Sequence, residues 1–158
     1  MIIRHARASD AEQLESFDIG GSSLWLNEVA EIVGGLLEWR SDPHAADRDR
    51  QVVVAVAEGR VVGVTAHERL IADNRRVWND HRYLMVAAIC GEHQRSGLGR
   101  LLIESTLAEL RATGCESVEW LVHPSNRQSI EFSRSVFPEA DETQPPEDHP
   151  YLSFAMAL

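Results

Sequence analysis

The 158-residue sequence contains no lysine, because all 15 of its basic residues are arginine. P-loop nucleotide-binding proteins need a lysine on the phosphates and Schiff-base enzymes need a lysine amine, so both classes are excluded. The only cysteines, Cys90 and Cys115, lack Cys-x-x-Cys spacing, which predicts reduced thiols and no metal site. No signal peptide pattern or apolar run of about 20 residues occurs, so we expect a cytoplasmic protein.

The charge balance is strongly acidic, with 25 Asp and Glu residues and a formal net charge of -10. Such a charge disfavours nucleic acid and anionic membranes as partners and favours a cationic one. Half of this charge lies in the segment 138–150, which holds five acids, Glu139, Asp141, Glu142, Glu147 and Asp148. The length and the 44% hydrophobic content predict one folded domain spanning 1–158.

Periodic apolar residues predict an alternation of strands and helices. We expect strands at 2–3, 52–57, 61–66, 83–90, 117–122 and 151–158, the second and third forming a hairpin and 83–90 being buried on both faces. We expect helices at 9–17, 26–37, 98–112 and 126–136, the first and last starting with capping boxes, Ser9 with Glu12 and Ser125 with Gln128. The remaining polar stretches, 41–50, 71–80 and 138–150, are predicted loops.

Residues 94–100, QRSGLGR, lie between the predicted central strand and the helix that follows it. Glycines at 97 and 99 allow a ligand to approach the backbone, and the first-turn N–H groups of the helix carry partial positive charge. The segment therefore suits an anion. It is not the dinucleotide fingerprint, whose third glycine would fall at Leu102. The alternative is a strand-to-helix turn without a ligand.

This segment resembles motif A, [Q/R]-x-x-G-x-[G/A], of the GNAT (Gcn5-related) N-acetyltransferases. The order of predicted elements is similar to the family's order over essentially the whole chain, and Asn126 follows the strand at 117–122 as in the family. The resemblance implies an α/β (α+β) GNAT fold, a central mixed β-sheet flanked by helices. It also implies acetyl-CoA as co-substrate, no metal, an amine acceptor and, as in many members, a homodimer.

By the same resemblance, the pyrophosphate of CoA would lie on backbone N–H groups at the start of the helix, and the pantetheine would pair with the backbone around Ile89. The strands ending at Cys90 and Val122 would part to admit the thioester. The residues that the resemblance assigns to CoA are Ile89, Gln94, Arg95, Ser96, Gly97, Leu98, Gly99, Arg100 and Asn126.

The catalytic positions depart from the family pattern. Where many members have a Tyr that protonates the departing thiolate, this chain has Ser133, a far weaker acid. Where several members have a Glu or His base, it has Tyr83, which either lines the acceptor cavity or fills the core. His123 is either near the parting of the strands or a surface residue. Glu68 and His81 are weaker candidates, and a base acting through water stays open.

We therefore predict an acetyl-CoA-dependent N-acetyltransferase that acts on a small-molecule or peptide amine by direct attack on the thioester. The alternatives are a CoA-binding module without catalysis and an acyltransferase for a longer acyl-CoA. Cys90 and Cys115 are not expected to carry the acyl group, because neither has an evident base partner. The acidic loop either borders the acceptor site or is merely solvated, and Trp25 and Trp39 either wall an acceptor pocket or pack in the core or an interface.

Overall fold

A computed structural model of the chain describes residues 1–19, 51–71, 77–144 and 150–158. The helix predicted at 26–37, the loop predicted at 41–50, and Trp25 and Trp39 lie outside the described residues. Glu147 and Asp148 of the acidic loop lie outside them as well.

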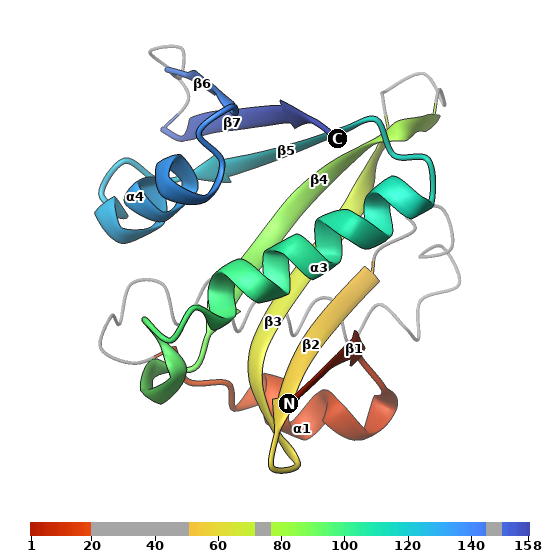
Figure 1. The fold of residues 1–158 in the computed structure, drawn as a ribbon, viewed down its shortest axis with the longest axis vertical. Helices are drawn as coiled ribbons and strands as arrows, with labels where there is room; N and C mark the ends of the chain where they lie inside the picture. Colours follow the sequence, from red (N-terminus) through yellow and green to blue (C-terminus); the bar gives the residue numbers. More distant parts are fainter. Residues whose placement is uncertain (20–50, 72–76, 145–149) are drawn as a thin grey trace.

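Seven strands form one mixed sheet in the order β1-β2-β3-β4-β5-β7-β6 (Figure 1). Neighbouring strands are antiparallel, except that β4 and β5 are parallel. The structure confirms the predicted α/β class with a mixed sheet. The strands are β1 (Ile2–His5), β2 (Gln51–Ala57), β3 (Arg60–Ile71), β4 (Val77–Ile89), β5 (Ser117–Val122), β6 (Asp141–Thr143) and β7 (Leu152–Ala157).

Helices lie on both faces of this sheet (Figure 1). They are α1 (Ala11–Glu15), α3 (Leu98–Ala112) and α4 (Arg127–Val136), with short 3-10 helices η1 (Ala8–Asp10) and η4 (Gly91–His93). α3 provides the crossover between the parallel strands β4 and β5, as the βαβ pattern predicted. It ends as expected, with Gly114 in the left-handed region at φ 80°.

The alternation of side chains in β2 divides the core between the two faces. Val53 and Ala55 pack in one cluster with Leu102 of α3, whereas Val54 packs on the other side with Leu14 of α1. All five are 2% exposed or less, and each such burial contributes about 1–3 kcal/mol for the larger side chains. This packing fixes the position of α3, and therefore of its N-terminus, above the sheet.

Several predicted boundaries were wrong. Residues 77–80 are strand rather than loop, because β3 and β4 continue as one long hairpin in which Ile71 pairs with Val77. Residues 141–143 are also strand, because they pair with the edge of β7. The central strand is not buried on both faces, since Ala87 is exposed.

Both predicted capping boxes were wrong, the first by two residues and the second by one. The carboxylate of Asp10, not Ser9 with Glu12, accepts the backbone N–H of Arg7 at 2.7 Å. At α4 the side chain of Asn126 accepts the N–H of Ser129 at 3.1 Å, so Asn126 is the N-cap. Asn and Asp cap at least as well as Ser, and here each satisfies a helix-start N–H group.

The sheet opens between β4 and β5. Their pairing ends at Leu84 and Trp120, although β4 continues to Ile89 and β5 to Val122. A register shift leaves Met85 of β4 without a partner position in β3, and β5 stays paired with β7 to its end. Beyond Leu84, β4 therefore presents a backbone edge that β5 does not cover.

Candidate functional site

The N-terminus of α3 lies at one end of this opening. Gly97 is its N-cap, with φ 85° and no side chain of its own, and the N–H of Leu98 makes a long hydrogen bond of 3.4 Å to Oγ of Ser96. Arg95 also has a positive φ, 60°, so the chain turns sharply before the helix begins. The first-turn N–H groups of α3 have no acceptor within the helix, and together with the helix dipole they form an anion-binding terminus.

A cavity of about 460 Å³ adjoins this terminus and extends between α3, α4 and the open edge of β4. Its volume lies within the usual range for a small-molecule or cofactor site. Seven of the nine residues predicted to bind CoA line it, namely Ile89, Gln94, Arg95, Gly97, Gly99, Arg100 and Asn126. The structure thus brings together residues from the end of β4, the motif and the start of α4.

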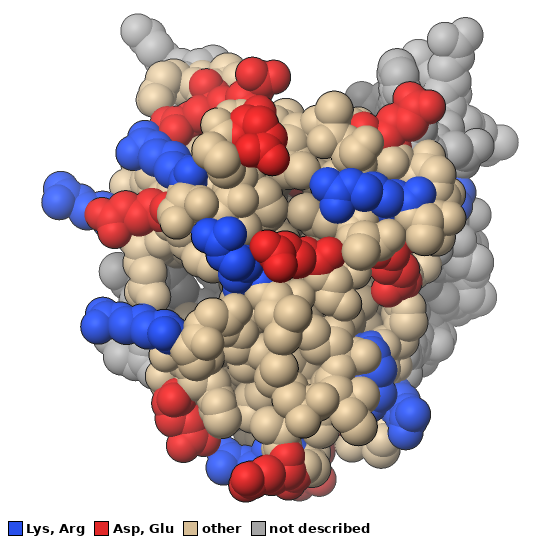
Figure 2. Space-filling model, in the orientation of Figure 1, with Lys and Arg blue, Asp and Glu red and all other residues tan. Residues whose placement is uncertain are grey.

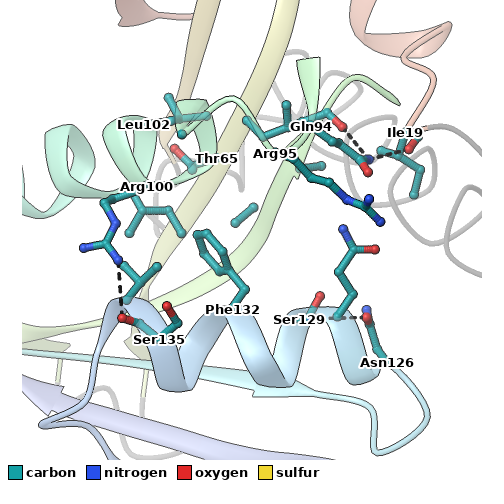
Figure 3. Close-up of a pocket in the computed structure, with 18 residues that line it drawn as sticks. Ile19, Thr65, Gln94, Arg95, Arg100, Leu102, Asn126, Ser129, Phe132 and Ser135 are labelled. Carbon is teal, nitrogen blue, oxygen red and sulfur yellow. Dashed lines mark hydrogen bonds between the residues drawn. The ribbon is translucent and has the colours of Figure 1, made fainter. Parts of the chain in front are cut away.

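Two arginines stand on opposite sides of this cavity, with Phe132 of α4 between them (Figure 3). Arg100 donates to the backbone carbonyl of Ser135 at 3.4 Å. Its side chain is half exposed and lies 3.9 Å from Glu104, so its positive charge remains accessible to an anion. Both guanidinium groups therefore suit phosphate oxygens, which arginine binds in a bidentate manner.

The remaining motif side chains build the loop. Gln94 donates to the carbonyl of Ile19 at 2.6 Å and to that of Ile89 at 3.1 Å, which ties the segment after α1 to the end of β4 (Figure 3). Ser96 is exposed and donates to the carbonyl of His93, and Leu98 is 5% exposed and packs in the core. Ser96 and Leu98 thus do not line the cavity with their side chains.

A second cavity, of about 170 Å³, occupies the gap between β4 and β5. It shares five lining residues with the first, Ala87, Ile103, Asn126, Ser129 and Phe132. Because β5 residues alternate between the faces, Trp120 and Leu121 reach it from opposite sides of the sheet. The two cavities form a path from the N-terminus of α3 through the opened sheet.

Ser133 lines the gap cavity but is already engaged. The indole N–H of Trp120 donates to Ser133 Oγ at 3.0 Å, and the two residues are 6% and 4% exposed. Trp120 also stacks on Phe154, with ring centroids 5.6 Å apart. The Ser133 hydroxyl therefore satisfies a buried indole donor on the α4 side of the gap.

His123 and Tyr151 stand together at the gap, on its side away from α3. Their rings meet edge to face, 5.5 Å apart and at 82°. His123 Nδ1 accepts the backbone N–H of Ser125 at 3.2 Å and contacts the Ser125 hydroxyl at 2.8 Å. Because Nδ1 accepts, the neutral ring carries its proton on Nε2.

Tyr83 lies outside both cavities, on the sheet face opposite α3. It is opposite Glu68 of β3 and Glu119 of β5 in the strand register. Burial, then the negative charges of Glu119 and Glu68 and the nearby phenol of Tyr151, raise the pKa of Tyr83 to about 12. Its phenol therefore stays protonated at neutral pH and is a poor base.

Glu119 is held by two neighbours on the same face. Ser153 donates to its Oε1 at 2.7 Å, and Nε2 of His81 lies 3.5 Å from its Oε2. The other ring nitrogen of His81 contacts Ser117 Oγ at 2.5 Å. This half-buried polar strip, defined as Glu68, His81, Tyr83, Glu119 and Ser153, lies next to the point where β4 and β5 part.

The two cysteines pack away from both cavities. Cys115 is buried in the core near the carbonyl of Ser117, and Cys90 is half-buried where β4 ends. Over residues 1–19, 51–71, 77–144 and 150–158, no group of three or more His, Cys, Asp or Glu side chains could hold a metal ion. None of the helices described there is long and apolar enough to cross a membrane.

Several residues that line the two cavities were not predicted from the sequence. Ser129, Phe132 and Val136 follow Asn126 on one face of α4, at helical spacing, so the amphipathic pattern carried a signal for them. Thr65 and Tyr151 carried no such signal. They reach the cavities only through the pairing of β3 with β4 and of β7 with β5.

The charge on the face that bears α3 is mixed rather than of one sign. Figure 2 shows arginine and acidic side chains interspersed over this face. Long-range attraction therefore contributes little to anion binding in a chain of net charge -10. Local donors, the helix-start N–H groups with Arg95 and Arg100, would have to hold an anion.

Comparisons with known proteins agree with this geometry. A model of the Acetyltransferase (GNAT) family matches residues 13–136. The fold is similar to a GNAT-family protein from Desulfovibrio desulfuricans, with a TM-score of 0.79 at 15% identity, covering 99% of this chain and 98% of that one. A search of curated proteins finds no significant match.

Two further solved structures have the same fold over their full length. A ribosomal-protein-alanine N-acetyltransferase from Brucella melitensis gives a TM-score of 0.72 at 19% identity, covering 100% of both chains. The PaiA N-acetyltransferase from Thermoplasma acidophilum, solved in complex with coenzyme A, gives 0.71 at 15% identity, also covering 100% of both chains. At such identities the likeness shows the fold and not the substrate.

Proposed function

The chain belongs to the GNAT family of acetyltransferases, and from that premise we propose that it transfers the acetyl group of acetyl-CoA to a small-molecule or peptide amine. The observation that carries the proposal is the continuous path from the N-terminus of α3 into the gap between β4 and β5. One end of this path suits an anionic pyrophosphate, and the other is a small cavity that opens toward a polar strip.

In this proposal the pyrophosphate lies on the N–H groups that follow Gly97, with Arg95 and Arg100 at the sides. Support comes from the left-handed N-cap, which is a glycine and has no side chain of its own, and from the two arginines of the large cavity. Because the chain has no lysine, arginine is its only permanently charged basic side chain for a phosphate, and backbone dipoles add the partial positive charge.

The pantetheine would run along the open edge of β4 and pair with it as an added strand. This is supported by the end of β4–β5 pairing at Leu84 and by the exposure of Ala87. The gap cavity, about 170 Å³ and lined by Trp120, Phe132 and Phe137, supports a short acyl group over a long one. A series of acetyl-, propionyl- and longer acyl-CoA substrates would test that preference.

The acceptor would approach from the polar strip. Carboxylates of Glu68 and Glu119 favour a cationic amine there, and the protonated phenol of Tyr83 can donate or present its ring face to a cation. Along β5, Glu119 lies two residues before Leu121 of the gap cavity, a distance of roughly 7 Å. At that range Glu119 would receive the amine proton through water rather than directly.

Release of thiol from acetyl-CoA across a panel of monoamines, diamines, amino acids, aminoglycosides and peptides tests the proposal. We expect release that depends on the amine, and Glu119→Gln should raise KM for a diamine more than for a monoamine of equal length. CoA binding without amine-dependent release by any acceptor would instead identify a binding module that lacks catalysis.

A further inference from the structure

The proposed transfer leaves a thiolate on CoA, and a positioned proton donor accelerates such a departure. Side chains that can donate a proton at neutral pH are few in this chain. The whole sequence has no lysine, two cysteines and two tyrosines. Cys90 and Cys115 line neither cavity, which leaves hydroxyl, phenol and imidazole groups at the gap.

Ser133 is poorly suited to this role. An aliphatic hydroxyl is a far weaker acid than a phenol, whose pKa is about 10. The Ser133 oxygen also accepts the buried indole N–H of Trp120, which occupies one of its lone pairs. His123 is oriented by Ser125 as a neutral ring with its proton on Nε2, and a neutral imidazole N–H is likewise a weak acid.

The two tyrosines are neighbours on the face away from α3, close enough for the Tyr151 phenol to help raise the pKa of Tyr83, but they differ in what they line. Tyr83 lies among carboxylates and lines neither cavity. Tyr151 lines the gap cavity, the same cavity that Ser133 lines from α4. It immediately precedes β7, whose first residue, Leu152, pairs with Val122 at the end of β5.

The neighbours of Tyr151 hold it at this place. Leu152 next to it is 6% exposed and packs in the core with Val122, which anchors the backbone. The edge-to-face contact with His123, at 5.5 Å, restricts the phenol ring from the other side. Of the phenols in the whole sequence, the structure therefore holds one at the gap.

We propose that Tyr151 is the proton donor to the sulfur of CoA, an inference that rests on the proposed acetyl transfer. The nitrogen lone pair of the amine forms the new N–C bond, and the C–S bond breaks with its electron pair remaining on sulfur. Sulfur takes the proton of Tyr151 Oη, and a solvent proton restores the phenol. The proton lost by nitrogen passes to water, so the net products are the acetylated amine and free CoA.

A spectroscopic test needs no acceptor. In Tyr83→Phe protein Tyr151 is the remaining tyrosine, so tyrosinate absorbance follows its ionisation alone. Saturating CoA, whose thiolate would lie beside the phenol, should move the titration midpoint to higher pH than desulfo-CoA does. Equal midpoints with CoA and desulfo-CoA would overturn the proposal, because sulfur and phenol would then not be neighbours.

A kinetic test uses the same two-tyrosine composition. Tyr151→Phe should lower kcat by about 100-fold, while KM for acetyl-CoA and the thermal stabilisation by CoA stay unchanged. In Tyr83→Phe protein made with 3-fluorotyrosine, position 151 carries a more acidic phenol. The alkaline limb of the plot of kcat against pH should then move to lower pH. An unchanged limb, or an unchanged kcat in Tyr151→Phe, would overturn the proposal.

These results separate the two hypotheses. If the Tyr151→Phe variant transfers acetyl groups as fast as the wild-type protein, the donor role of Tyr151 is refuted and the acetyltransferase proposal is left intact. Wild-type protein that binds CoA and acetylates no amine would refute the acetyltransferase, and the donor role with it. Desulfo-CoA serves as the matched control in the first test, and the unfluorinated Tyr83→Phe protein serves in the second.

Discussion

The indole N–H of Trp120 in β5 donates to the hydroxyl oxygen of Ser133 in α4 at 3.0 Å, and both residues are buried. This bond links the sheet to α4 at the gap through which the thioester is proposed to enter. Ser133 thus has a structural role at the position where many members of the family have a catalytic tyrosine.

Ser133→Ala should remove the acceptor and leave the Trp120 N–H without its partner in the protein. We expect a loss of about 1 kcal/mol in the free energy of unfolding, measured by urea denaturation, because an unsatisfied buried donor is costly. Its effect on kcat should be smaller than that of Tyr151→Phe. A larger loss of kcat with unchanged stability would contradict this assignment and return Ser133 to the role of proton donor.

The ion pair of Arg4 with Asp10 should make the free energy of unfolding depend on pH in the acid range. The hydrogen bond from Arg4 lowers the pKa of Asp10 from 3.8 to about 2, against an opposing effect of burial. The stabilisation, roughly 2 kcal/mol, is fully present above pH 4 and is lost as pH falls toward 2. In urea denaturation from pH 7 to 2, the advantage of wild type over Asp10→Asn should shrink below pH 4. A difference in stability between wild type and Asp10→Asn that stays constant down to pH 2 would contradict the lowered pKa of Asp10.

Gly97 and Gly99 should respond oppositely to alanine. Gly97 has φ 85°, where a Cβ costs about 1–2 kcal/mol, and the strain should also disturb the N–H groups that follow it. A Cβ on Gly99 meets Phe132 at 3.4 Å, an ordinary contact, and alanine favours the helix by up to about 1 kcal/mol. Thermal unfolding with and without CoA should show Gly97→Ala lowering both stability and the CoA-induced shift. Equal unfolding temperatures for the two variants would argue against this.

Arg100 should contribute to phosphate binding, whereas Arg111 on the same helix serves as its control. Arg111 is eleven residues farther along α3, roughly 16 Å from the cavity end of the helix. Arg100→Gln should weaken CoA binding several-fold in calorimetry, more at low than at high salt, because one exposed charge contributes up to about 1 kcal/mol. Arg111→Gln should leave the affinity unchanged. If both substitutions weaken CoA binding equally, Arg100 acts only through the net charge of the protein and not through a direct contact.

The sequence predicted the parts of the site that are local in the chain. Residues 89–100 combine a strand end, a left-handed glycine and a helix start, and each has its own sequence signal. The crossover helix and the parallel strand after it were likewise predictable, since the chain must return to the same sheet edge.

The rest depends on where strands pair and where pairing stops. No local pattern shows that β4 and β5 separate after Leu84, and the apolar run at 83–90 therefore predicted burial on both faces. Tyr151 follows Val122 by 29 positions and reaches the gap because β7 pairs with β5. Such long-range register is not encoded in the residues around either position.

The central claim, that the path from α3 into the gap holds acetyl-CoA, is tested most directly by thermal unfolding of the wild-type protein with acetyl-CoA, CoA and ATP. We predict stabilisation by both CoA compounds, about 2.7 kcal/mol when the ligand is at 100 times its Kd, and a smaller shift with ATP. The absence of stabilisation by acetyl-CoA and by CoA at millimolar concentration would contradict the account.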